Sequence, residues 1–114
     1  MTTHKITLNS PWFEYVKSGE KTYEGRRWTD KMETIQPGDI LEIHHHTDKT
    51  LNSYSKIVIQ IIKFKTFEEA LNNPDILKKA LPGVSSVPEG VEIYKKYVSI
   101  QTQLKDGVCL IELE

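Results

Sequence analysis

The stretch YSKIVIQIIKF, residues 54–64, is the feature that most limits how this chain can fold. Its isoleucine and valine residues are branched at Cβ, and such residues favour strands over helices. The apolar positions are nearly continuous, which predicts a strand covered on both faces. The chain is therefore expected to build its core around a β-sheet.

Four shorter segments are expected to supply the other strands. They are HKITL (residues 4–8), EKTYEGRRW (20–28), the strand that begins at Ile40 in QPGDILEIHHH (36–46), and GVCLIEL (107–113). Pro37-Gly38 predicts the turn before the third of these segments, and TDKTLNS (47–53) predicts a hairpin loop after it.

Helix start and stop signals fall between the predicted strands. Ser10 is expected to be an N-cap with Pro11 in the first helical position, and Gly19 is expected to end that helix. Two Ser/Thr-x-x-Glu capping boxes begin at Thr66 and at Ser86. A further short helix is predicted to open at Asn73-Pro74 and to close at Pro82-Gly83.

These elements predict an α+β fold of about five mostly antiparallel strands with helices in the connections, compatible with a small β-barrel. No internal repeat and no Gly/Ser linker divides the 114 residues, so residues 1–114 are expected to form a single domain.

Composition narrows the classes of partner. The chain has 15 basic and 16 acidic residues, a net charge of −1, so no overall positive field attracts nucleic acid or anionic lipid, and any contact with nucleic acid has to be local. No apolar run approaches the roughly 20 residues of a membrane span, and MTTHKITLNS lacks the hydrophobic region of a signal peptide. We expect a cytoplasmic protein without membrane contact, in which the single Cys109 is a small buried hydrophobic residue.

The segment SGEKTYEGRRW, residues 18–28, carries an unusual density of charge next to aromatic rings. Glu24 and Arg26 share one face of a regular strand, whereas Lys21 falls on the opposite face. Lys21 joins the pair only if it precedes the strand or if Gly25 marks a bulge. The alternative is a solvated surface pair worth less than about 1 kcal/mol.

Other residues that could carry chemistry have ordinary structural explanations. His44 and His46 point the same way from a strand, but no third ligand lies at metal-binding spacing, so exposed titrating histidines and no metal site are expected. The capping box already accounts for Glu89. Tyr94 and Tyr97 are expected to be core-facing rings of one helix and not platforms for stacking a base.

The segments SPWFEYVKSGEKTYEGR, IQPGDILEI and GVCLIELE together resemble the ASCH domain, a member of the PUA-like superfamily, over nearly the whole chain. The family pattern Gly-x-Lys-Thr-x-Glu-x-Arg is matched by Gly19, Lys21, Thr22, Glu24 and Arg26. The resemblance implies a small β-barrel with helices beside a cleft that receives this motif, and it implies a link to RNA.

One bacterial branch of the family resembles an amidohydrolase that removes acetyl from acetylcytidine by means of a lysine, a threonine and a glutamate. Lys21 matches the lysine, but Glu24 occupies the threonine position, so a threonine-based acyl transfer does not carry over to this chain. The family glutamate corresponds to Glu89 or Glu92, with Glu89 preferred.

Two functions remain open from the sequence. In the first, the cleft binds single-stranded RNA or a modified nucleoside: Lys21 or Arg26 holds a phosphate or carbonyl, Glu24 accepts a base amine, and Trp12 or Trp28 stacks on the base. In the second, the chain is an amidohydrolase of a small nucleoside amide that uses Lys21, Glu24 and Glu89. Neither function requires a cofactor.

Overall fold

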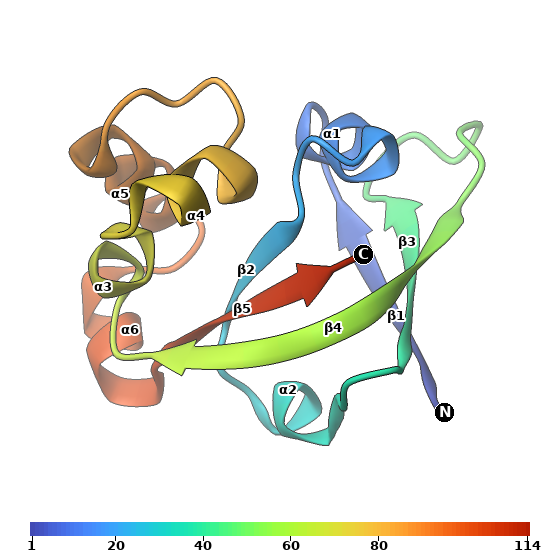
Figure 1. Cartoon of the computed structure of the whole chain (residues 1–114), viewed down its shortest axis with the longest axis horizontal. Helices are drawn as coiled ribbons and strands as arrows, with labels where there is room; N and C mark the ends of the chain where they lie inside the picture. The colour runs from blue at the N-terminus through green and yellow to red at the C-terminus, as the bar shows by residue number, and fades with distance from the viewer.

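The computed structural model describes residues 1–114 of the protein, and its sheet and helices alternate along the chain (Figure 1). The strands are β1 (Thr3–Leu8), β2 (Tyr23–Arg27), β3 (Ile40–His45), β4 (Tyr54–Phe64) and β5 (Val108–Leu113). The helices are α1 (Trp12–Ser18), α2 (Asp30–Thr34), α3 (Phe67–Leu71), α4 (Pro74–Ala80), α5 (Val87–Lys95) and α6 (Ile100–Asp106). None of these helices has the length and apolar character of a membrane-spanning segment.

The five strands form one curled sheet in the order β1-β3-β4-β5-β2. Only the β1–β3 pair is parallel, and the other three pairs are antiparallel, which confirms the predicted α+β class with mostly antiparallel strands. β1 and β2 are the two edges of the sheet, so the strands form a half-barrel. The helices α3 to α6 gather on one side of it, next to β2 and to the start of β5 (Figure 1).

Two apolar clusters hold these parts together. The first fills the half-barrel and includes Phe13 and Val16 of α1, Leu41 and Ile43 of β3, and Ile111 of β5. The second lies among the helices, and its members are Phe67, Leu71, Leu77, Ala80, Leu81, Val91, Tyr94 and Val108. Both clusters draw on β5, so this strand is the wall between them. Cys109 lies in it fully buried, as expected, and burial raises the pKa of its thiol to about 12.

The prediction that residues 54–64 form a strand is confirmed, but the prediction that both faces are covered is wrong. Val58 is the only buried residue of β4, whereas Ile57 and Ile59 are 45% and 46% exposed. The physical reason lies in the placement of the helices, none of which crosses β4 (Figure 1). Its outer face therefore keeps apolar side chains in contact with solvent.

The start of α1 also differs from expectation. Ser10 does not cap the helix: no side chain caps α1, and Pro11 occupies the N-cap position. The Ser10 hydroxyl instead donates to Glu14 Oε2 at 2.8 Å and lies 3.0 Å from His45 Nε2, which connects the helix to β3. Gly19 ends α1 as predicted, with φ of +87°.

The other predicted helix starts are confirmed by side-chain caps. Thr66 Oγ1 accepts from the Glu69 amide, Asn73 Oδ1 from the Asp75 amide, and Ser86 Oγ from the Glu89 amide. Two helices were not predicted. α2 has no side-chain cap, and α6 is capped by Ser99, whose partner three residues on is Thr102 and not the Glu or Gln of a capping box.

The turn before β3 is organised by one carboxylate. Asp39 is largely buried and accepts from the backbone amides of Thr2 and Gln36, while its Oδ2 lies 2.9 Å from His4 Nε2. These hydrogen bonds hold the pKa of Asp39 down at about 2, below the usual 3.8. Asp39 therefore ties the start of β1 to the start of β3.

The lowered pKa of Asp39 predicts how stability changes with pH. The ionised carboxylate stabilises the fold fully above its unfolded pKa of 3.8, and this contribution is lost as the pH falls through about 2. Asp39→Asn should therefore lower the melting temperature at pH 7, and the difference from wild type should shrink between about pH 4 and pH 2. Thermal unfolding of both proteins from pH 7 to pH 2 tests this; a constant difference would contradict it.

Candidate functional site

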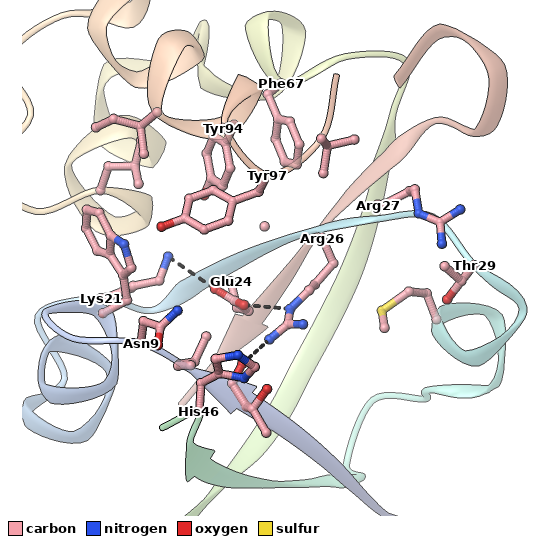
Figure 2. A pocket seen from close by; sticks show the side chains of 18 residues that line it. Asn9, Lys21, Glu24, Arg26, Arg27, Thr29, His46, Phe67, Tyr94 and Tyr97 are labelled. Atoms are coloured by element: carbon pink, nitrogen blue, oxygen red, sulfur yellow. Dashed lines mark hydrogen bonds and ion pairs between the residues drawn. The ribbon is translucent and has the colours of Figure 1, made fainter. Parts of the chain in front are cut away.

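A cavity of about 480 Å³ lies where the half-barrel meets the helices, and 18 residues line it (Figure 2). One wall is formed by β1, β2, Asn9 and the start of α1, and the other by α3, α5 and the segment that follows α5. Charged groups from β2 project into it, beside the rings of Tyr94 and Tyr97 (Figure 2).

Lys21 occupies the floor of the cavity and is only 2% exposed. Lys21 precedes β2, which begins at Tyr23. This is one of the two conditions under which the sequence predicted that Lys21 could join Glu24 and Arg26. Its Nζ donates to the carbonyl of Tyr23 at 2.6 Å and to the carbonyl of Ala80 at the end of α4. Burial lowers the pKa of Lys21, and Glu24 opposes that shift.

Glu24 is the buried centre of the charged group, at 5% exposure. Its Oε1 lies 3.5 Å from Lys21 Nζ, and its Oε2 accepts from Arg26 Nε at 2.7 Å. Two cations thus neutralise one buried carboxylate, which excludes the solvated surface pair considered from the sequence.

Arg26 reaches across the open side of the half-barrel. Its Nη2 donates to the carbonyl of Thr7 in β1 at 2.8 Å, so its guanidinium bridges the two edge strands (Figure 2). The side chain is 28% exposed, and Nη1 makes no hydrogen bond within the protein. Part of the guanidinium is therefore free to meet a ligand.

Aromatic rings form the opposite wall. Tyr94 stacks on Phe67 with ring centroids 3.9 Å apart and planes 8° from parallel. Its buried hydroxyl has no hydrogen-bond partner, and burial raises the pKa of that hydroxyl. Tyr97, in the same wall, is 63% exposed. Trp12, at the start of α1 and so on the β-strand side of the cavity, is half-buried, with its ring centroid 5.7 Å from Lys21 Nζ.

The structure brings four of the candidate residues together and leaves two apart. Trp12, Lys21, Glu24 and Arg26 all line the cavity. Trp28 and Glu89 lie outside it. Trp28 packs under Lys63, whose Nζ is 4.6 Å from the ring centroid.

The two glutamates matched to the family glutamate are both on the surface of α5. Glu89 is exposed, and its Oε2 accepts from the Ser85 hydroxyl at 3.1 Å. Glu92, one turn further along, pairs with Lys95 at 3.3 Å. Neither carboxylate lines the cavity.

The three consecutive histidines, His44 to His46, do not converge on one point. His44 Nε2 lies 2.6 Å from Glu42 Oε1, and His45 is buried, where its Nδ1 accepts from the backbone amides of Thr47 and Asp48. His46 lies in the cavity wall. No three His, Cys, Asp or Glu side chains come together as metal ligands would.

Sequence reasoning missed Tyr94 and Tyr97 as cavity residues. Tyr94 does face the core as predicted, but Tyr97 lies past the end of α5 and is exposed. The residue in the sequence that relates to the position of Tyr94 is Gly25. A Cβ added there would lie 2.6 Å from Tyr94 Oη, so the glycine leaves room for the ring. The contact joins residues far apart in the chain, and spacing alone does not reveal it.

The geometry defines a class of protein. A five-stranded half-barrel with helices in its connections is the PUA-like α+β fold. The model of the ASCH domain matches residues 6–114, so the chain belongs to the ASCH domain family.

Solved structures agree with this assignment. The chain matches the crystal structure of hypothetical protein PH0355 at 32% identity and a TM-score of 0.84, covering 100% of this chain and 98% of the other. It matches the solution NMR structure of protein PF0455 from Pyrococcus furiosus at 29% identity and a TM-score of 0.75, covering 99% and 96%. The crystal structure of ASCH from Zymomonas mobilis shares the fold alone, at 15% identity, a TM-score of 0.70, and coverage of 99% and 67%. Comparison with curated proteins gives no match.

The contact between Gly25 and Tyr94 predicts a coupled effect on stability. Gly25→Ala places a Cβ against the phenol ring and should lower the free energy of unfolding by about 1–3 kcal/mol, the usual cost of overpacking. The same substitution should cost less in a Tyr94→Leu background, because the shorter side chain gives way. Denaturant unfolding of the four proteins of this double-mutant cycle tests the coupling; additive losses would count against it.

Proposed function

We propose that the cavity binds a nucleobase, presented either by single-stranded RNA or by a modified nucleoside. The observation that carries the proposal is the buried Glu24 carboxylate, which keeps unused acceptor positions beside the partly free Arg26 guanidinium. Membership of the ASCH family supports a link to RNA.

Hydrogen-bonding capacity supports a base as the ligand. Arg26 takes one position on Glu24 Oε2, and the Lys21 ammonium lies 3.5 Å from Oε1. An ionised carboxylate has about four such positions, so Glu24 can still accept from a ring or exocyclic N–H. Arg26 Nη1 can donate to a neighbouring carbonyl or ring nitrogen. Adjacent donors and acceptors of this kind occur on the edge of every nucleobase.

Size and lining agree with a ligand of this class. A volume of about 480 Å³ falls within the roughly 300–1,000 Å³ typical of small-molecule sites. Half of the 18 lining residues are hydrophobic, and Trp12 offers an aromatic ring next to the charged group. Apolar surface would hold the base while Glu24 and Arg26 select its edge.

Hydrolysis of a small nucleoside amide is the second candidate, and the lowered pKa of the buried Lys21 beside Glu24 favours it. In this reaction Glu24 would accept a proton from water as the water oxygen attacks the amide carbonyl. The carbon–nitrogen bond would then break, and the amine would leave with that proton. Binding is preferred because the Tyr23 and Ala80 carbonyls and Glu24 already engage the Lys21 ammonium.

Glu24→Gln tests the proposed site. This nearly isosteric change removes the negative charge between Lys21 and Arg26, and affinity for a ligand that donates to Glu24 should fall by about 1.5–3 kcal/mol. The measurement is isothermal titration with a nucleoside or short RNA selected by a thermal-shift screen. Glu89→Gln, on the exposed surface of α5, is the matched control and should bind as wild type does. Wild-type affinity in Glu24→Gln would overturn the site assignment.

The same variant separates binding from hydrolysis. If the chain is an amidohydrolase, acetylcytidine incubated with wild type is converted to cytidine and acetate, and Glu24→Gln lowers turnover about 100-fold or more while binding persists. Chromatography of the reaction mixture detects the products. An acetylcytidine complex that stays unchanged would leave binding as the function.

A further inference from the structure

Tyr97 is the most exposed aromatic ring of the cavity wall. At 63% exposure it differs from Phe67 and Tyr94, which are buried in the same wall, and from the half-buried Trp12. It lies on the helical side of the cavity, opposite Asn9 and His46 (Figure 2). Packing within the protein does not account for a ring in this position.

The backbone beneath Tyr97 is fixed, although the side chain is free. The amides of Tyr97 and Val98 both donate to the carbonyl of Tyr94, at 3.0 and 2.9 Å, which anchors the segment to the end of α5. The Tyr97 hydroxyl makes no hydrogen bond within the protein. A tyrosine ring that is 63% exposed on an anchored backbone can stack on a planar group at low cost in conformational entropy.

The charge of the cavity wall favours a ligand that carries phosphate. Lys21, Arg26 and Arg27 contribute three positive charges, and Glu24 is the only acid in the wall. Asp106 pairs with Arg27 from outside the cavity at 3.0 Å, and even with this acid counted the site keeps one positive charge on a chain whose net charge is −1. Local positive charge attracts a nucleotide strand and not a neutral nucleoside.

We propose that the ligand is a single-stranded RNA, that one of its bases enters the cavity, and that Tyr97 stacks on the neighbouring base. This inference rests on the proposed function and selects single-stranded RNA, and not the free nucleoside, as the ligand. The base inside the cavity meets Trp12, Glu24 and Arg26, while the exposed ring of Tyr97 faces the base outside. Stacking on an aromatic ring tolerates any base, so Tyr97 would add affinity without sequence preference.

The experiment compares Tyr97→Ala with wild type on two sets of probes. The first set is fluorescein-labelled RNA octamers of A, C or U, and the second is the four nucleoside 5′-monophosphates. Tyr97→Ala should weaken octamer binding about 5- to 150-fold, as expected for the loss of one base stacked on one ring. Affinity for a monophosphate should change less than threefold, because a monophosphate has no neighbouring base.

Two control variants sharpen the comparison. Tyr97→Phe keeps the ring and should restore octamer affinity to within about threefold of wild type. Leu104→Ala truncates another exposed apolar side chain, 69% exposed on α6 and outside the cavity wall, and should have no effect on octamer binding.

The outcomes distinguish this inference from the proposed function. Wild-type affinity of Tyr97→Ala for the octamers would overturn the role of Tyr97 and leave nucleobase binding intact. Binding of a nucleoside or monophosphate by wild type, without binding of any octamer, would also overturn it. Failure of wild type to bind any nucleoside, monophosphate or octamer would overturn both.

Discussion

The ion pair between Glu24 and Arg26 is the interaction on which this structure depends most. Backbone hydrogen bonds leave the half-barrel open between its edge strands, and Arg26 crosses that gap to the carbonyl of Thr7. The guanidinium keeps this orientation because Glu24 holds its Nε. Glu24 tolerates burial only because Lys21 and Arg26 neutralise it, since a buried charge without partners is strongly destabilising. The same two interactions of Arg26, with Glu24 and with Thr7, therefore shape the cavity and link the edges of the sheet.

Lys21 has a different structural role from Glu24 and Arg26. The Lys21 ammonium engages two backbone carbonyls and a carboxylate, and through Ala80 it fastens the end of α4 to β2. Its charge suits that place, because carbonyls at the end of a helix favour a cation. Lys21 supports the floor of the site, whereas Glu24 and Arg26 keep hydrogen-bonding capacity directed into the cavity. One charged motif thus contributes different members to the support of the cavity floor and to its polar lining.

Local signals in the sequence predicted the elements well, and contacts between distant residues account for what they missed. The caps at Thr66 and Ser86 and the end of α1 at Gly19 depend on neighbours within a few residues, so spacing reveals them. The exposure of Ile57 and Ile59 depends on where the helices pack, and no pattern within β4 encodes that. The motif from Gly19 to Arg26 located the charged half of the site. The rings of Phe67, Tyr94 and Tyr97 come from positions much further along the chain, and only the fold brings them near the motif.

β2 has a single partner in the sheet, and this governs the order in which the chain can fold. Tyr23 pairs with Glu112 and Arg27 with Val108, so β2, near the start of the chain, can pair only when β5, at the end of the chain, is present. β1 likewise pairs only with β3, in parallel, and the two edge strands meet through Arg26 once both ladders exist. Non-local pairings of this kind slow folding, because the entropy of closing long loops is lost before the contacts form. The cavity therefore depends on both of these pairings, and a fragment of the chain that lacks β5 leaves β2 without its only partner in the sheet.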